Sequence, residues 1–159
     1  MADVDLVFRD ARSGDEPTIR YIVTTVLAEF GFDTDPEGLD SDLVDIRSSY
    51  FERGGTFRVL TTSRDEVVGC GGLYPLPPSD AELRKMYFLP VARGHGFGRV
   101  LVAELLAFGR RAGFKRILLE TASKLTAAGH IYRSFGFVET TSDHLAERAD
   151  QALVLYLSV

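Results

Sequence analysis

Apolar residues recur every three or four positions in two stretches of the first third of the chain, and this spacing predicts two helices, each with one buried face. The first helix is expected to begin at residues 15–17, where two acids and a proline suit a first helical turn, and to end at Gly31. The second is expected within residues 33–51, before the glycine pair at residues 54–55. The apolar positions are Ile19, Ile22, Val23, Val26, Leu27 and Phe30 in the first helix and Leu39, Leu43, Ile46 and Tyr50 in the second.

The remaining sequence alternates between strand-like runs and two further helical stretches. Pro75, Pro77 and Pro78 predict a loop after the third strand, because proline cannot donate a hydrogen bond to a strand ladder. The element order is βααβββαβαββ, and with neither a repeat nor an interdomain linker, residues 1–159 are expected to form one domain. The strands are expected at residues 4–9, 56–62, 66–74, 82–89, 116–121, 137–140 and 152–158, and the later helices at residues 96–112 and 126–135.

Composition and charge narrow the possible classes of protein. The chain has 159 residues, 45% hydrophobic and 26% charged, as is usual for a globular protein, and none of its apolar runs approaches a membrane span. The N-terminal residues lack the basic and apolar regions of a signal peptide, so a cytoplasmic location without a membrane partner is expected. The net charge of −5 argues against nucleic acid as the main partner.

Cysteine and histidine give no sign of metal or disulfide chemistry. Cys70 is the one cysteine in the sequence, and its glycine neighbours favour a small residue packed in a strand over a nucleophile. His95, His130 and His144 lack the spacing of metal ligands and are interpreted as surface or turn residues, so no metal is expected.

A glycine-rich turn at residues 93–99 opens directly into the third predicted helix. Gly94, Gly96 and Gly98 allow positive φ and a close approach of the backbone to a ligand, because glycine has no Cβ. The first N–H groups of a helix lack intrahelical partners and carry the positive end of its dipole. Arg93 and Arg99 add fixed positive charge beside them. The segment therefore predicts a binding site for a pyrophosphate, with a plain connecting turn as the alternative.

Two common phosphate-binding loops do not match this turn. A Rossmann site needs a third glycine where Arg99 stands, and a P-loop needs a lysine followed by serine or threonine after the glycines. The pattern Arg93-x-x-Gly96-x-Gly98 instead resembles the acyl-CoA-binding motif of the GNAT superfamily of N-acetyltransferases. The resemblance extends to residues 81–90 and 131–137, in the order that the family uses.

This resemblance implies the GNAT fold, an α/β fold of mixed α+β type in which a strongly bent mixed sheet is flanked by helices. It implies acetyl-CoA as the co-substrate, and homodimers are frequent in the family. In the family, the strand before the turn supplies backbone N–H groups for the pantetheine and the thioester carbonyl. The resemblance assigns to the cofactor Tyr87, Phe88, Leu89, Arg93, Gly94, His95, Gly96, Phe97, Gly98, Arg99, Ala128 and Tyr132.

Tyr132 is the first candidate for catalysis of acetyl transfer to an amine. The resemblance places it beside the sulfur of CoA, where a phenol can protonate the departing thiolate; a packing role is the alternative. Leu125 departs from the family pattern, because many members have Asn at this position and thereby gain a polar contact near the cofactor.

Glu82 is the candidate general base, acting directly or through a water, and a solvated or arginine-paired glutamate is the alternative. Strand alternation places Glu82 on one face with Arg84, Met86 and Phe88, unless the bulge that is usual in this strand interrupts the alternation. The reserve candidates for the base are Glu120 and Tyr87.

The acceptor is predicted to be the primary amine of a small molecule or a peptide. The resemblance makes the first two helices and their connection one wall of the acceptor groove, and residues 33–45 contain six acids without a Lys or Arg. Such a run is usually a solvated face, but it would also attract a cationic acceptor such as a polyamine, an amino sugar or a lysine side chain. Arg84 and Lys85 favour instead an acceptor with a carboxylate.

Three functions follow from these patterns. An acetyl-CoA-dependent N-acetyltransferase is the leading prediction. A non-catalytic acetyl-CoA-binding sensor of the same fold is the second, because the Asn is missing and the base is uncertain. A Rossmann-type nucleotide-binding module is the third.

Overall fold

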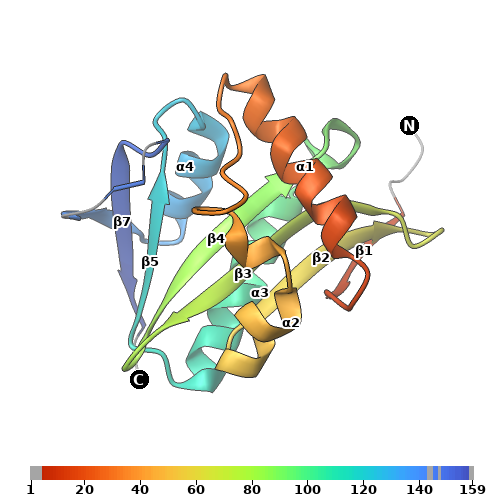
Figure 1. Ribbon diagram of the computed structural model, residues 1–159. Coiled ribbons are helices and arrows are strands. Elements are labelled where there is room, and N and C mark those ends of the chain that lie inside the picture. Colours follow the sequence, from red (N-terminus) through yellow and green to blue (C-terminus); the bar gives the residue numbers. More distant parts are fainter. Residues whose placement is uncertain (1–4, 143–144, 147, 158–159) are drawn as a thin grey trace.

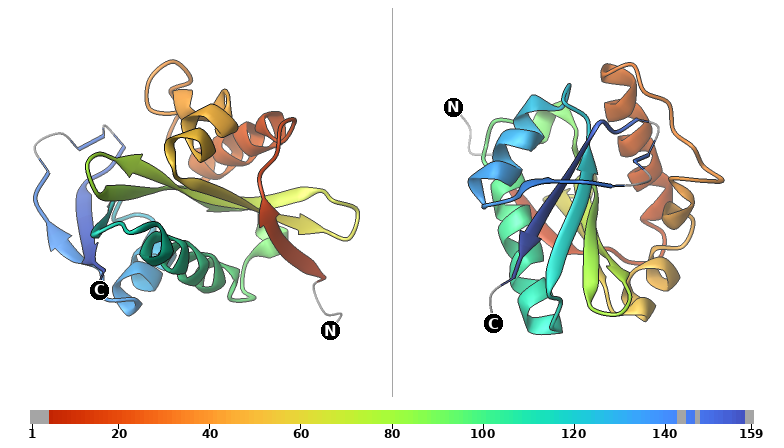
Figure 2. Two further views of the ribbon diagram at one scale, coloured as in Figure 1. Left: turned by 90° about the horizontal axis from the view of Figure 1, so that it is seen from below. Right: turned by 90° about the vertical axis from the view of Figure 1, so that its left-hand side faces the viewer.

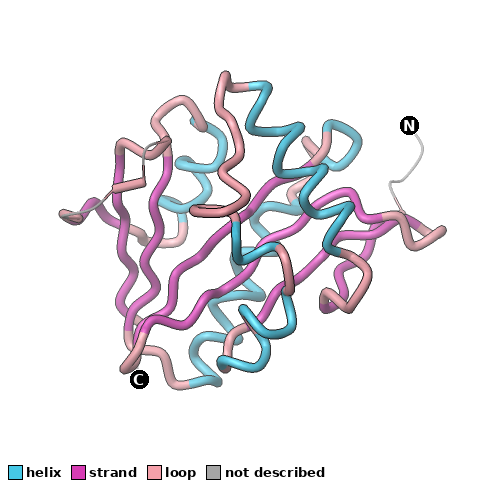
Figure 3. The backbone as a smooth tube through the Cα atoms, viewed as in Figure 1, coloured by secondary structure: helices cyan, strands magenta, loops and turns pink. Residues whose placement is uncertain are grey.

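Within residues 5–142, 145–146 and 148–157, which this computed structural model describes, the chain forms a seven-stranded sheet with two α-helices on each face (Figure 1). The strand order is β1-β2-β3-β4-β5-β7-β6, and only β4 and β5 pair in parallel (traced as tubes in Figure 3). The strands are β1 (Leu6–Asp10), β2 (Thr56–Thr62), β3 (Val67–Leu76), β4 (Asp80–Phe88), β5 (Arg116–Thr121), β6 (Val138–Thr140) and β7 (Gln151–Tyr156). The helices are α1 (Glu16–Glu29), α2 (Ile46–Ser49), α3 (Phe97–Ala112) and α4 (Thr126–Ser134). The predicted order and the mixed α/β class are confirmed.

Each pair of helices buries an apolar stripe against one face of the sheet. The left view of Figure 2 shows α1 and α2 above the sheet and α3 and α4 below it. On α1 the predicted apolar positions from Ile19 to Leu27 are buried, and on α3 the buried positions run from Leu101 to Gly109. The sheet therefore has a separate apolar core on each side.

The second predicted helix is shorter than its apolar spacing indicates. Only α2 is α-helical, with one 3-10 turn before it and one after it. Leu39 was expected on its buried stripe but is 38% exposed, so that expectation is wrong. Asp35 accepts a hydrogen bond from the N–H of Leu39, and Asp40 accepts one from the N–H of Asp35. These local bonds give the backbone an alternative to the helix.

The loop predicted between the third and fourth strands begins later than expected, because Pro75 belongs to β3. Pro75 pairs with Ala81 of β4, but the pairing of β3 with β2 extends only to Leu73. The N–H that Pro75 lacks therefore breaks no hydrogen bond between β3 and β2. The turn of the hairpin is confined to residues 77–79.

β4 carries the expected bulge, and this bulge changes which side chains share a face. Lys85 and Met86 together oppose Gly71 of β3, and Lys85 has a φ of 60°. Arg84 stacks on Tyr74 and Lys85 binds Asp42, so both lie on the sheet face that carries α1 and α2. Met86 and Phe88 instead pack in the core on the side of α3. The expectation that Met86 and Phe88 share a face with Glu82 is therefore wrong.

Candidate active site

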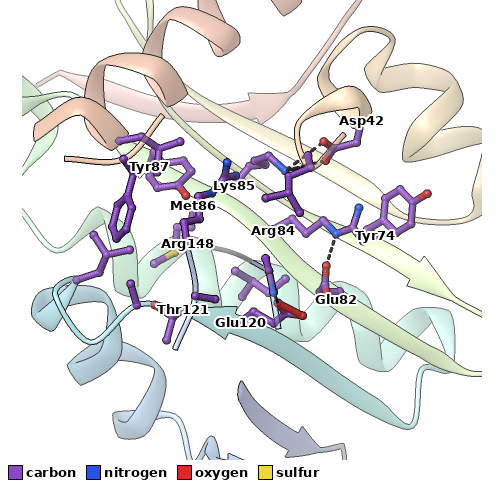
Figure 4. Close-up of a pocket in the computed structure, with 18 of the residues that line it drawn as sticks. Asp42, Tyr74, Glu82, Arg84, Lys85, Met86, Tyr87, Glu120, Thr121 and Arg148 are labelled. Carbon is purple, nitrogen blue, oxygen red and sulfur yellow. Dashed lines mark hydrogen bonds and ion pairs between the residues drawn. The ribbon is translucent and has the colours of Figure 1, made fainter. Parts of the chain in front are cut away.

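A cavity of about 640 Å³ opens where β4 and β5 separate (Figure 4). The two strands pair only from Asp80 to Glu82 with residues 116–118, and beyond this point they diverge. The space between them is lined by β4, β5 and α4 and by two loops, which contribute residues 35–42 and Ala146, Arg148 and Ala149. The cavity thus collects groups that are far apart in the sequence.

The turn before α3 presents backbone donors rather than side chains. Gly94 and Gly96 have φ values of 81° and 82°, and Gly96 is the N-cap of α3 without a side-chain hydrogen bond. Val100 is the first residue of the helix whose N–H bonds within it, and in the described ranges the N–H groups of residues 94–99 have no acceptor. Such unpaired donors at a helix start suit a pyrophosphate.

Gly98 serves the packing of two helices. The expected positive φ is confirmed at Gly94 and Gly96 and wrong at Gly98, which already lies in α3. A Cβ at Gly98 would lie 2.8 Å from Cδ1 of Ile131 on α4. The absence of a side chain therefore brings α4 against the start of α3.

The side chains around this turn have partners within the protein. Arg93 makes a bidentate ion pair with Glu29 of α1 at 2.9 and 2.6 Å, and its Nε donates to the carbonyl of Phe88. Arg99 donates to the hydroxyl of Ser134 on α4 at 2.7 Å. Phe97 packs edge-on against Phe8, and the exposed His95 lies beside Phe97. Their expected contacts with a phosphate stay predictions.

The end of β4 turns one backbone donor toward the split. The N–H of Leu89 donates to the carbonyl of Val68 at 2.9 Å and so belongs to the ladder with β3. Alternation then directs the N–H of Phe88 toward β5, and its expected contact with pantetheine stays a prediction. The ring of Tyr87 lines the cavity, and burial raises its pKa to about 12.

Tyr132 lies on α4 and lines the cavity with Leu125 and Ala128 of the same segment. Its ring contacts Phe137 at 5.9 Å between centroids, and its side chain is 6% exposed. Burial raises the pKa of Tyr132, so the phenol is protonated at neutral pH. The position suits both packing and proton donation.

Glu82 and Glu120 face the cavity from opposite sides of the split. Glu82 pairs in register with Leu118, so Glu120, two residues later on β5, lies on the same face of the sheet. Glu82 is ion-paired with Arg84, whose guanidinium lies 3.8 Å from the ring centroid of Tyr74. Glu120 accepts a hydrogen bond from the N–H of Ala146 at 2.6 Å.

Sequence reasoning missed a buried network of charges beside these residues. The Nζ of Lys85 lies 3.1 Å from Asp42 and 3.3 Å from Asp40, and it donates to the carbonyl of Leu39 at 3.0 Å. Tyr50 donates its hydroxyl to Asp42. Burial and the Asp42 carboxylate raise the pKa of Tyr50. The usual bulge in β4 was the one signal that Lys85 would turn inward.

Arg148 completes this network from the loop before β7. Its two terminal nitrogens donate to Asp40 at 2.9 and 2.6 Å, which joins the loop of Asp40 to the loop of Arg148 across the cavity. Burial favours the neutral form of Asp40, but the hydrogen bonds from Arg148 and the N–H of Asp35, with the charge of Lys85, lower its pKa. The sequence around Arg148 has no pattern that marks it.

Comparison with known proteins decides the family. The model of the acetyltransferase (GNAT) family matches residues 23–137. An uncharacterized N-acetyltransferase, YjgM from Escherichia coli, is 36% identical over 136 residues, which cover 82% of this chain and 81% of that protein. The chain belongs to the GNAT acetyltransferase family.

Solved GNAT structures share the fold. A GNAT acetyltransferase from Staphylococcus aureus has a TM-score of 0.89 at 20% identity, covering 96% of this chain and 99% of that one. A phosphinothricin acetyltransferase from Sinorhizobium meliloti in complex with acetyl-CoA has a TM-score of 0.77 at 18% identity, with 96% and 89% coverage.

The structure also bears on the predictions about the cysteine, the histidines, a membrane span and a metal site. Cys70 is buried in β3 as expected, and burial raises the pKa of its thiol to about 12. His95 and His130 are exposed, and His144 lies outside the described residues. Among the described residues, no helix is long and apolar enough to cross a membrane. In the same part of the chain, no three His, Cys, Asp or Glu side chains are grouped to hold a metal ion.

Proposed function

We propose that this GNAT protein transfers an acetyl group from acetyl-CoA to the primary amine of a small molecule or a peptide by direct attack on the thioester. The observation that carries the proposal is the position of α4. Ile131 touches the start of α3, while Ala128 and Tyr132 line the cavity. One short helix therefore links the backbone donors at residues 94–99 to the carboxylates between β4 and β5.

The residues present fit acetyl-CoA, which supplies an activated acetyl carbonyl and a thiolate leaving group. The N–H groups of residues 94–99 bind the pyrophosphate, assisted by Arg93 and Arg99. The backbone of residues 87–89, with the N–H of Phe88 directed into the split, holds the pantetheine and the carbonyl oxygen. Tyr132 donates its phenolic proton to the departing sulfur, which its protonated state at neutral pH permits.

A carboxylate in the cavity accepts the proton that the amine must lose. Glu82 does so directly or through a water, although its ion pair with Arg84 engages one of its two oxygens. Glu120 is the reserve candidate, because Ala146 donates its N–H to one oxygen of Glu120 and leaves the other oxygen available to the cavity.

The ion pair of Glu82 also favours a second function. A GNAT protein without an effective base would bind acetyl-CoA and regulate a partner without turnover, as a sensor. The cytoplasmic location and the homodimer remain predictions that accompany either function.

Calorimetric titration with acetyl-CoA, followed by thiol release with a panel of amines, tests the proposal. Binding with release on one class of amine is the expected result, and Tyr132→Phe should lower kcat about 100-fold or more without weakening acetyl-CoA binding. Tyr21→Phe is the matched control, because Tyr21 is 62% exposed on α1. Binding without turnover on any amine would favour the sensor, and no binding would refute both functions.

A further inference from the structure

Arg84 offers the cavity hydrogen-bond donors that the protein itself does not use. Its Nε donates to Glu82, and its guanidinium stacks on Tyr74. In the described part of the chain, its two terminal nitrogens have no hydrogen-bond acceptor. Figure 4 shows the side chain extended across the cavity between Tyr74 and Glu82.

This arrangement suits a carboxylate on the ligand. The two terminal nitrogens of a guanidinium form a planar fork that matches the two oxygens of a carboxylate. Stacking on Tyr74 fixes the plane of that fork. A second guanidinium, that of Arg53, lies 4.2 Å from the same ring centroid.

The neighbouring charges are already neutralised. The three contacts of Lys85, to Leu39, Asp40 and Asp42, occupy its ammonium group, so Lys85 is unsuited to the role that the sequence suggested for it. The acids expected to attract a cationic acceptor are used in the same way, since Asp40 and Asp42 are ion-paired.

Two more acids of residues 33–45 accept hydrogen bonds from backbone N–H groups. Asp35 accepts the N–H of Leu39, and Asp45 caps α2 by accepting the N–H of Ser48. Asp33 and Glu37 are exposed. Asp33, Glu37 and Asp45 do not line the cavity, and Asp42, which does, is paired with Lys85. Less of the negative charge of residues 33–45 therefore faces the cavity than the sequence suggests.

Glu120 supplies the opposite charge on the other side of the split. It shares the sheet face of Glu82 and Arg84 and lines the same cavity. A ligand with an ammonium group and a carboxylate would find a partner for each, Glu120 for the first and Arg84 for the second.

We propose that the acceptor is an amine that also carries a carboxylate, as an amino acid does, and that the terminal N–H groups of Arg84 bind this carboxylate. The inference rests on the proposed acetyl transfer and names its substrate class. Arg84 then sets both the choice of acceptor and the direction in which the amine points.

The test compares acids with their amides. The acceptors are the common L-amino acids, β-alanine and γ-aminobutyrate, each beside its carboxamide, together with spermidine. The proteins are the wild type, Arg84→Gln, Arg84→Lys and the control Arg47→Gln, since Arg47 is 73% exposed and lies outside the cavity. Thiol release gives kcat and KM, and calorimetry gives the Kd of acetyl-CoA. Calorimetry with N-acetylated amino acids and their amides, in the absence of acetyl-CoA, gives a readout independent of turnover.

The wild type should use at least one acid about 10-fold or more better than its amide. Arg84→Gln should raise KM for that acid about 10- to 100-fold relative to KM for its amide and should change the Kd of acetyl-CoA little. Any effect of the substitution through Glu82 should act on the acid and the amide alike. Arg84→Lys keeps the positive charge but lacks the planar pair of N–H donors. Its KM for the acid should therefore lie between the values of the wild type and Arg84→Gln. Arg47→Gln should match the wild type.

Equal use of acids and amides, or a preference for spermidine that Arg84→Gln does not alter, would overturn the inference. If no amine is acetylated although acetyl-CoA binds, the transferase proposal fails by itself. The N-acetylated ligands then decide about Arg84: acid binding that Arg84→Gln removes supports the inference, and acid binding that is absent or unchanged refutes it.

Discussion

The proposed cofactor end of the site, at residues 94–99, and its proposed acceptor end, in the cavity between β4 and β5, are built in opposite ways. At the cofactor end, consecutive residues 94–99 offer backbone N–H groups on an exposed turn, shaped by two glycines with positive φ. At the acceptor end, side chains arrive from β3, β4, β5 and two loops, and several of them are buried in ion pairs. The first end depends on local backbone conformation, and the second depends on the whole tertiary structure.

This difference separates the effects that substitutions should have. A change at the turn should alter acetyl-CoA binding and leave global stability nearly intact, because few contacts depend on it. A change in the buried network should unfold the protein before it alters the affinity for acetyl-CoA, because it leaves a buried charge without its partner.

Lys85→Met should produce the largest effect. The side chain of Lys85 is 6% exposed, and its removal leaves Asp40 and Asp42 short of a cation. We expect a loss of about 3 kcal/mol in the free energy of unfolding, measured by urea denaturation. Lys115→Met, at an exposed position, should change it by less than about 0.5 kcal/mol. Equal effects of the two substitutions would show that the network contributes nothing.

Asp40→Asn should have the next largest effect, and it should depend on pH. The folded protein holds the pKa of Asp40 below its usual value, so its contribution to stability is complete above about pH 4 and is lost as the pH falls through the lower, folded value. At pH 7 the variant should be less stable by about 2 kcal/mol, and the difference should shrink as the pH falls below 4.

Urea denaturation at a series of pH values measures this difference. Asp33→Asn is the control, because Asp33 is exposed. A difference between the wild type and Asp40→Asn that stays constant from pH 7 to pH 3 would contradict the role given to the ion pair with Arg148.

The same contrast explains which features the sequence could predict. The strands at residues 56–62 and 116–121, the start of α3 and the glycine turn depend on neighbouring residues, and all lie within one residue of their predicted positions. The family resemblance rested on the same local segments. Local patterns therefore sufficed for most of the fold and for the conformation of the glycine turn.

The acceptor end could be predicted only in part, because its geometry depends on distant contacts. The face of Met86 depends on how β4 opposes Gly71, which no pattern within β4 records. Pro75 is tolerated in β3 because β2 has already ended beside it. Arg148 matters because its loop reaches Asp40, 108 positions away in the chain.

Gly96→Ala tests the cofactor end and should have a moderate effect. Its φ of 82° strains any other residue, although a Cβ there would meet no atom within 4 Å. The strain should cost about 1 kcal/mol and should disturb the donors at the start of α3, which raises the Kd of acetyl-CoA about 5- to 10-fold.

Gly14→Ala is the matched control for this substitution. Gly14 has a φ of 100° and equally open surroundings, but it lies in the turn before α1. It should lower stability by a similar amount and leave the Kd of acetyl-CoA unchanged. If both substitutions raised that Kd equally, the effect at Gly96 would reflect stability and not the turn.

The smallest effect should come from Arg93 and Glu29, and it separates two roles of the arginine. The pair is exposed, with side chains 40% and 37% accessible, so neither Arg93→Gln nor Glu29→Gln should shift the midpoint of thermal unfolding measurably. If Arg93 binds a phosphate, Arg93→Gln should weaken acetyl-CoA binding a few-fold at low salt, and less at high salt. Glu29→Gln should leave acetyl-CoA binding equally strong or make it stronger, because the guanidinium of Arg93 loses a competing carboxylate. Equal weakening by both would instead mean that Arg93 acts by tying the turn to α1, and the cofactor end would then share the tertiary dependence of the acceptor end.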